Sequence, residues 1–279
     1  MICEKLNIYD KKIYDGCENV VLETYIRAKS VELPVPPRPA VLVFGGGGYE
    51  YVSDREVEPI ANLYLAAGYN VFALRYSVKQ NAAGGKPILD AAQALYTIRK
   101  NAENWHVDPE KIAVWGASAG GHLAAAISTM WHREEIYKTL DIPYGSAKVN
   151  GAILAYPVIS GITSPHQRSF MNIIGSENPT REELEAYSCE LNVTKNTPPS
   201  FIWHTMPDSC VSVENSLVYA QALSKQKIPY ELHIFPMGEH GISRATPETS
   251  PNPSYDIPYI ARWGEWSVKW LEHVFGGSR

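Results

Sequence analysis

A serine between glycines is the first candidate for chemistry in this chain of 279 residues. Ser118 lies in the run Gly116-Ala117-Ser118-Ala119-Gly120, a GxSxG pattern between the apolar stretch 111–115 and the alanine-rich stretch 122–130. A serine on so sharp a turn takes a strained backbone conformation, so the residues two before and two after it must lack side chains. A strand before the pattern and a helix after it predict a nucleophile on the turn.

Asp208 and His240 are the candidate partners of that serine. Asp208 follows the apolar stretch 200–204 and His240 follows the apolar stretch 230–235, so each lies just beyond a predicted strand. Taken singly, Asp208 could cap a helix that begins near Val213, and His240 could be an ordinary loop histidine. Their order after the serine, and their matching positions, favour a triad in which the histidine is the base and the aspartate orients it.

Four other histidines fit the role of base less well. His204 and His233 lie within predicted strands, and His106 precedes one. His122 lies on the predicted helix that follows the serine, and we regard it instead as a candidate substrate contact.

The glycine run 45–48, which ends at Tyr49, directly follows the apolar stretch 40–44. Glycines let the backbone approach a substrate carbonyl and aim N–H groups at it, which is what an oxyanion hole requires. A phosphate-binding loop is the alternative, but the run lacks both the Lys-Ser/Thr ending of a P-loop and the spacing of a dinucleotide-binding loop. Tyr49 is a further candidate substrate contact. We expect the charged run 54–56 to be a solvated helix start, with Arg55 open to substrate binding or loop support.

Short apolar runs that alternate with helix-period segments predict parallel strands joined by crossover helices. The predicted strands are 40–44, 70–75, 111–115, 151–156, 200–204 and 230–235. The first 30 residues, which mix polar and apolar side chains, predict one or two antiparallel edge strands. The predicted helices are 57–67, 87–105, 122–130 and a C-terminal helix with Trp263, Trp266 and Trp270 on one face, which we expect to pack on the sheet.

Two segments interrupt this alternation. Residues 157–199, with one weak helical piece at 181–189, predict an insertion or small cap, and residues 243–258 contain four prolines and predict a long loop. Either could close over the site. We find no internal repeat and no linker of the kind that separates domains, so we expect a single α/β domain over 1–279.

The composition limits the class of protein. Hydrophobic residues make up 45% and charged residues 20% of the chain, which is typical of a globular protein. The net charge of −5 argues against nucleic acid or an anionic membrane as a partner. We find no signal-like stretch in 1–12 and no membrane span, and we expect a cytoplasmic protein whose four cysteines are reduced thiols. No metal or cofactor motif is present, and both a monomer and a homo-oligomer remain open.

Together these motifs resemble the α/β-hydrolase superfamily, and in particular its acetyl xylan esterase-like and hormone-sensitive-lipase-like carboxylesterase branch. The resemblance covers most of the chain. Its motifs are Gly46-Gly47-Gly48-Tyr49 with Ser53-Asp54-Arg55-Glu56, Leu74-Arg75-Tyr76, Asp108-Pro109-Glu110-Lys111-Ile112, the run from Gly116 to Ala124, Tyr156-Pro157, and the loops of Asp208 and His240. Gly45 stands where lipase-like relatives usually have His and acetyl-esterase-like relatives often have Pro.

The resemblance implies a mostly parallel, eight-stranded, doubly wound sheet with the triad at its C-terminal edge. It also implies oxyanion donors at the backbone amides of Gly47, Gly48 and Ala119. The implied activity is hydrolysis of small acyl esters, and kinship with the acetyl-esterase side suggests acetylated sugars as substrates. A general short-chain carboxylesterase, a peptidase of the same fold and a non-catalytic ligand receptor on a hydrolase scaffold remain as alternatives.

Overall fold

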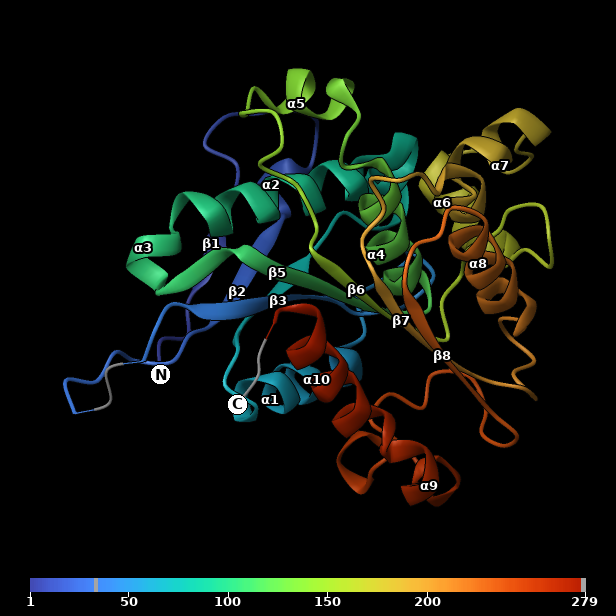
Figure 1. Ribbon diagram of the computed structural model, residues 1–279. Coiled ribbons are helices and arrows are strands. Elements are labelled where there is room, and N and C mark those ends of the chain that lie inside the picture. The colour runs from blue at the N-terminus through green and yellow to red at the C-terminus, as the bar shows by residue number, and fades with distance from the viewer. Residues whose placement is uncertain (33–34, 277–279) are drawn as a thin grey trace.

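One eight-stranded sheet, in the order β1-β2-β4-β3-β5-β6-β7-β8, organises the computed structural model, which describes residues 1–32 and 35–276 (Figure 1). The strands are β1 (Lys5–Asn7), β2 (Val21–Tyr25), β3 (Arg38–Phe44), β4 (Asn70–Arg75), β5 (Val107–Ala117), β6 (Gly151–Ala155), β7 (Ser200–Thr205) and β8 (Tyr230–Phe235). Neighbours from β4 to β8 pair in parallel, and β1 and β2 pair antiparallel at one edge. The predicted α/β fold and its antiparallel edge are confirmed.

Helices cover both faces of this sheet. They are α1 (Glu58–Ala66), α2 (Lys86–Lys100), α3 (Ala102–Trp105), α4 (Ala119–Met130), α5 (Glu134–Leu140), α6 (Gln167–Ile174), α7 (Arg181–Tyr187), α8 (Glu214–Lys225), α9 (Pro258–Ala261) and α10 (Trp263–Val274). Short 3-10 helices are η1 (Cys17–Asn19), η2 (Asp54–Glu56), η3 (Lys79–Gly85), η4 (Cys189–Asn192), η5 (Pro247–Thr249) and η6 (Pro253–Tyr255). Figure 1 shows α1 and α10 on one face and α2, α4 and α8 on the other. None of the described helices has the length and apolar character needed to cross a bilayer.

The central strands are apolar along their whole length because both of their faces are covered. In β3, Ala40, Leu42 and Phe44 face a core shared with α2 and α4, and Val41 and Val43 face a core shared with α1 and α10. Because both faces are buried, the register of each strand relative to its neighbours is fixed. The positions at which the loops at the carboxyl ends begin are therefore fixed as well.

The tryptophans of α10 pack against the sheet, as the sequence predicts. The Trp263 ring stacks on Trp203 of β7 with 5.1 Å between centroids, and Trp266 stacks on His233 of β8 at 4.7 Å. Trp263 is completely buried. Rings of this size supply much of the apolar area on this face of the molecule.

Two elements differ from the sequence prediction. The predicted helix 87–105 is two helices, because Asn101 leaves the helical conformation. Its side-chain amide donates a hydrogen bond to the Thr97 carbonyl. The segment 157–199 contains α6 as well as α7 and η4, so it is more ordered than its proline and serine content indicates.

Candidate active site

Ser118 stands on the turn between β5 and α4, with the strained backbone angles φ 55° and ψ −120°. Its N–H donates to the carbonyl of Ala155 on β6 at 3.1 Å, which fixes the turn to the neighbouring strand. A Cβ on Gly116 would collide with the carbonyl of Gly120, and a Cβ on Gly120 would collide with that of Phe44. Both glycines are therefore required by the turn, as the pattern predicts.

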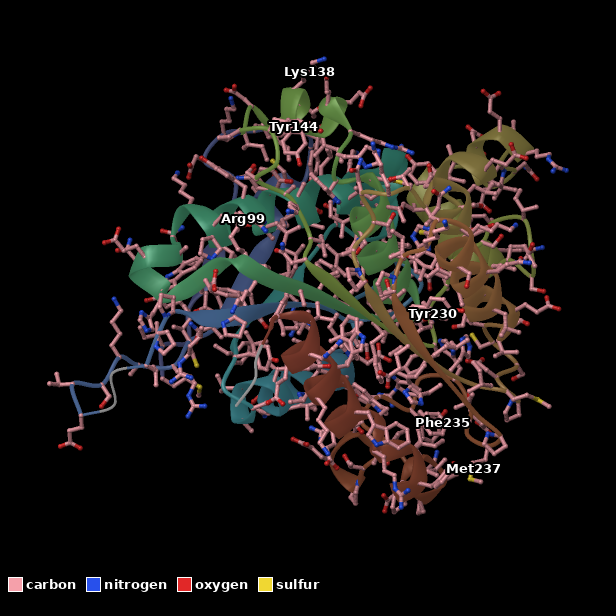
Figure 2. All side chains as sticks on the ribbon, in the orientation of Figure 1. Arg99, Lys138, Tyr144, Tyr230, Phe235 and Met237 are labelled. Atoms are coloured by element: carbon pink, nitrogen blue, oxygen red, sulfur yellow. The ribbon has the colours of Figure 1, made fainter. Side chains whose placement is uncertain are left out.

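The three residues of the predicted triad lie in one hydrogen-bonded row. His240 Nε2 is 2.8 Å from Ser118 Oγ, and His240 Nδ1 is 2.7 Å from Asp208 Oδ2. Because the carboxylate only accepts, Nδ1 carries the proton and Nε2 is free to accept from the serine hydroxyl. The three come from loops after β5, β7 and β8, which end at the same edge of the sheet. Figure 2 marks that end of β8 by Phe235 and Met237, with Tyr230 at the other end.

Asp208 is buried and fully bonded. Its Oδ1 accepts the N–H groups of Cys210 at 2.9 Å and Val211 at 2.8 Å. Burial raises the pKa of this carboxyl, but hydrogen bonds from His204 and His240 lower the pKa by a larger amount. The net effect holds the pKa well below its ordinary value. The carboxylate therefore stays charged, as the orienting member of a triad must.

His204 is a second histidine beside the same carboxylate. Its Nε2 lies 3.3 Å from Asp208 Oδ2 and 2.9 Å from the Val211 carbonyl, and its Nδ1 lies 2.8 Å from Ser216 Oγ. Since two acceptors face Nε2, this nitrogen carries the proton and the serine hydroxyl donates to Nδ1. His204 does lie on a strand, as predicted, but it also supports the acid of the triad.

The glycine loop lies next to Ser118. Gly47 and Gly48 have positive φ values of 126° and 64°, and a Cβ on Gly47 would collide with the carbonyl of Tyr51. Asn172 of α6, in segment 157–199, donates to the Gly48 carbonyl at 2.7 Å and supports the glycine loop. Ala119 is the first residue of α4, so its N–H has no acceptor within the helix and lies at the positive end of the helix dipole.

A pocket of about 290 Å³ opens over the serine. It is lined by Gly47, Gly48, Glu50, Tyr51, Ser53, Arg55, Glu56, Ser118, His166, Arg168, Cys210, His240 and Gly241. Two of these, His166 and Arg168, come from segment 157–199, and Arg168 Nε pairs with Glu50 Oε1 at 2.6 Å. Burial, and then the neighbouring His240, lowers the pKa of His166. Segment 157–199 thus contributes to the wall of the pocket, whereas loop 243–258 contributes no lining residue.

Tyr49 and His122 do not reach this pocket. The Tyr49 hydroxyl donates to His122 Nδ1 at 2.7 Å, and His122 Nε2 donates to the Tyr187 carbonyl at 2.8 Å. Both side chains are buried, and burial lowers the pKa of His122 to about 4. The two side chains are buried and bonded to protein groups, so they support the glycine loop and are not in a position to contact a substrate in this pocket. The structure does not support their prediction as substrate contacts.

The charged run 54–56 forms a short helix with an exposed Asp54, as expected, but its last residue is buried. Glu56 is only 3% exposed, and its Oε2 accepts the Gly46 N–H at 2.7 Å. Arg55 lines the pocket, and its guanidinium donates to the carbonyls of Gly241 at 3.2 Å and Thr249 at 3.3 Å. Arg55 therefore braces the loop after His240, one of the two roles left open by the sequence.

Sequence reasoning assigned no role in this site to five residues, although two of them stand in motifs of the family resemblance: Glu56, Tyr156, His166, Arg168 and His204. Tyr156 follows β6 directly, so its position at a strand end could have marked it, as it did Asp208. His166 and Arg168 do not lie at a strand end, so their positions in the sequence do not mark them. They reach the site only through the fold of segment 157–199.

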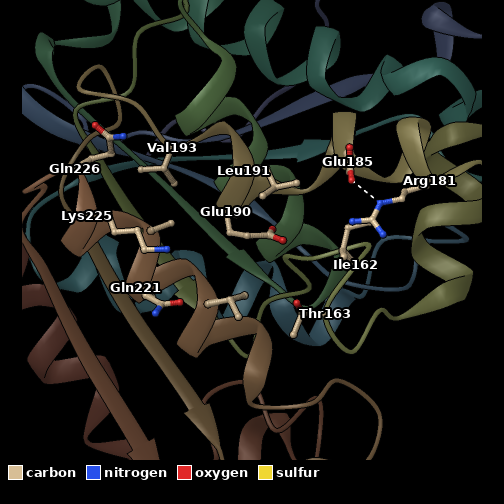
Figure 3. A pocket seen from close by; sticks show the side chains of 12 residues that line it. Ile162, Thr163, Arg181, Glu185, Glu190, Leu191, Val193, Gln221, Lys225 and Gln226 are labelled. Carbon is tan, nitrogen blue, oxygen red and sulfur yellow. Dashed lines mark hydrogen bonds and ion pairs between the residues drawn. The ribbon is translucent and has the colours of Figure 1, made fainter.

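A second cavity, of about 460 Å³, lies against α7, η4 and α8 (Figure 3). Figure 3 shows Arg181 paired with Glu185 on one side of it and Glu190 between them and Lys225. Its described lining contains no histidine, serine or cysteine that could form a nucleophile and base. Nor do the described residues group three His, Cys, Asp or Glu side chains in a way that could hold a metal ion.

Known proteins resemble the chain in sequence and in structure. A region 38% identical to it occurs in endo-1,4-beta-xylanase B of Butyrivibrio fibrisolvens, and one 30% identical in the acetylxylan esterase of Xylanibacter ruminicola. Each match covers 76% of this chain, but only 33% and 42% of those relatives. The matched regions therefore span less than half the length of either relative.

A solved structure matches nearly end to end. The acetyl ester-xyloside bifunctional hydrolase of Caldicellulosiruptor lactoaceticus superposes with a TM-score of 0.84 at 32% identity, over 99% of this chain and 97% of that one. The family model BD-FAE matches residues 29–223, which include the glycine loop, Ser118 and Asp208. The chain thus belongs to the BD-FAE family, in the acetyl xylan esterase-like branch of the α/β-hydrolases.

Proposed function

We propose that this protein is a serine esterase, a carboxylic ester hydrolase that acts through an acyl-enzyme. The observation that carries the proposal is the row Ser118–His240–Asp208, with links of 2.8 and 2.7 Å, beside a glycine loop and the start of α4. A hydroxyl, a base and an orienting carboxylate in this order are the parts that nucleophilic acyl transfer needs.

In the proposed reaction, Ser118 Oγ attacks the ester carbonyl while His240 Nε2 takes the hydroxyl proton. The protonated imidazole is stabilised by Asp208, and it gives the proton to the leaving alcohol as the tetrahedral intermediate collapses. Water then attacks the acyl carbonyl while His240 accepts a proton from it, and the protonated imidazole returns that proton to Ser118 Oγ as the acid is released. Asp208 keeps the imidazole in the required tautomer throughout.

We assign the oxyanion hole to the backbone amides of Gly47, Gly48 and Ala119. Gly47 and Gly48 line the pocket together with Ser118, and the Ala119 amide lies at the amino end of α4. Backbone N–H groups that are already in position stabilise the developing negative charge without reorganisation.

We further propose that the substrates are small acyl esters, and acetylated carbohydrates in particular. The pocket is small, and its lining includes the polar side chains of Glu50, Arg55, His166 and Arg168. Such groups suit a hydroxyl-rich alcohol better than an alkyl chain. The names of the acetylxylan esterase and of the acetyl ester-xyloside hydrolase support the same substrate class.

The test is hydrolysis of an ester series from acetyl to octanoyl, run beside acetylated xylo-oligosaccharides. We expect the acetyl ester to be fastest, and Ser118→Ala to lower turnover by about 10⁶-fold. A fluorophosphonate should label Ser118 in the native protein. Absence of labelling would favour a ligand receptor, and a preference for octanoyl would overturn the carbohydrate proposal.

A further inference from the structure

A buried row of hydrogen bonds joins the two loops on either side of Ser118. The Gly46 N–H donates to Glu56 Oε2 at 2.7 Å, and the Tyr156 hydroxyl donates to Glu56 Oε1 at 2.6 Å. The same phenol oxygen accepts the N–H of Ser243 at 3.0 Å. Glu56 is 3% exposed, and Tyr156 and Ser243 are completely buried. We refer to this row, from Gly46 to Ser243, as the Glu56–Tyr156 link.

Each end of the link lies close in sequence to a reacting part of the site. Gly46 directly precedes Gly47 and Gly48 of the glycine loop, and Ser243 follows His240 by three residues. The Ser243 hydroxyl also donates to the Arg55 carbonyl at 2.7 Å, so the loop after His240 is tied to η2 as well. A displacement of either loop would have to break bonds in the link.

Tyr156 contacts the base directly as well. Its ring packs edge-on against the His240 imidazole, with 5.1 Å between centroids. Its backbone has a φ of 36°, which is unfavourable for a residue with a side chain, and its N–H donates to the Trp203 carbonyl at 2.7 Å. Strain of this kind persists only where the surroundings hold the residue in place, and it is concentrated at functional sites.

The chemistry of the link makes it sensitive to the loss of any member. Both carboxylate oxygens of Glu56 accept a bond, and the phenol both donates and accepts. Removing one group leaves a buried donor or acceptor without a partner, and the loop that carries it gains by moving toward water. Through the link, a displacement of the glycine loop therefore also displaces the loop after His240, and the reverse.

We propose that Glu56 and Tyr156 are positioning residues that set the oxyanion glycines and His240 at the correct distance from each other. The inference rests on the proposed esterase function and extends it to two residues outside the proposed triad and oxyanion hole. Neither takes part in bond making, so their loss should slow the chemical step more than it weakens binding.

The test compares two variants that each lose one buried hydroxyl. Tyr156→Phe breaks the link and keeps the ring that packs against His240. Tyr64→Phe is the matched control, because Tyr64 is equally buried and its hydroxyl bonds Ser267 Oγ at 2.9 Å, which joins α1 to α10. The activity readouts are kcat and KM on a small acetyl ester and the rate of fluorophosphonate labelling.

We expect Tyr156→Phe to lower kcat and the labelling rate by about 10- to 100-fold with KM nearly unchanged, a smaller loss than removing an oxyanion donor itself. Tyr64→Phe should keep both rates within about twofold while losing a similar amount of thermal stability. Equal rates in the two variants would overturn the inference.

Glu56→Gln gives an independent reading if Tyr156→Phe does not fold. The amide offers one acceptor where two donors converge, so we expect a similar loss of kcat. The double variant should be no slower than the slower single variant, because both changes break one link. Losses that multiply would contradict a common role.

A spectroscopic readout separates failure of the inference from failure of the proposed function. The proton on His240 Nδ1, shared with Asp208, should shift or broaden in the NMR spectrum of Tyr156→Phe but not in that of Tyr64→Phe. If the wild-type protein neither hydrolyses esters nor labels, the esterase proposal is wrong, and this resonance still tests the link. An unchanged resonance would refute the link.

Discussion

Two buried aspartates, Asp90 of α2 and Asp208 of the loop after β7, have different hydrogen-bond partners and opposite pKa shifts. Asp90 of α2 accepts bonds from the hydroxyls of Tyr9 and Tyr14 and from the Ser77 N–H, and burial raises the pKa of its carboxyl. Asp208, faced by His204 and His240, has a lowered pKa although burial alone would raise it.

The difference teaches that burial by itself does not identify a functional carboxylate. Hydroxyl and amide partners satisfy Asp90, but their hydrogen bonds do not offset the effect of burial on the pKa of its carboxyl. Asp90 therefore fastens the segment between β1 and β2 to α2, which is a structural task. Two imidazoles at Asp208 favour its charged form, and only the charged form can stabilise a protonated His240.

The largest effect that separates the two aspartates is on turnover. Asp208→Asn should lower kcat by about 10⁴-fold, because the amide no longer holds His240 in the productive tautomer. Asp90→Asn, the matched change at the other site, should leave kcat within about twofold. Steady-state kinetics on an acetyl ester measures both. Equal losses would show that the two carboxylates do not differ in the way that their partners indicate.

His204 should have an intermediate effect. His204→Phe removes a donor to Asp208 and should lower kcat by about 10- to 100-fold, since a small misplacement of the triad has consequences of this size. His204→Gln can still donate a hydrogen bond and should recover part of the loss. His233→Phe is the control, because His233 bonds Glu231 and not Asp208. If His204→Phe had the same kcat as this control, the backbone donors of Asp208 would be sufficient to hold its carboxylate in position. His204 would then have no positioning role.

The smallest expected effect is an opposite pH dependence of stability. Asp208, with its lowered pKa, contributes stability that is complete above its ordinary value of 3.8 and is lost as pH falls. Asp90, with its raised pKa, binds its proton more tightly in the folded state, so its contribution is larger at low pH and is lost as pH rises.

Urea unfolding of the wild type and both Asn variants, between about pH 7 and about pH 3, measures these slopes. As pH falls, the wild type should lose stability relative to Asp208→Asn and gain stability relative to Asp90→Asn. Slopes of the same sign would mean that the two environments do not differ in charge preference.

The sheet could be predicted from the sequence because its strands are short apolar runs with clear ends. Strands 70–75 and 230–235 were predicted with their observed bounds. Strand β5 begins four residues earlier than predicted, since Val107 pairs with Arg38 ahead of a polar, proline-containing stretch. Local polarity hid this extension, and only the partner strand reveals it.

The site could be predicted where position at a strand end carries the information. Ser118 follows β5 directly, Asp208 and His240 lie in the loops after β7 and β8, and the structure brings the three together. Glu56 could not be predicted in this way, because a charged run at a helix start is normally solvated. Its burial depends on Tyr156, which is 100 residues away in the chain.

The base of the proposed triad depends on β8, the last strand in the sheet order. Such a strand has a hydrogen-bonded neighbour on one side only, so it can peel away at a lower free energy than the interior strands. When β8 frays, His240 leaves the serine while β3, β5 and β6 keep their pairing. On heating, catalysis should therefore fade while the far-ultraviolet circular dichroism is still that of the intact protein.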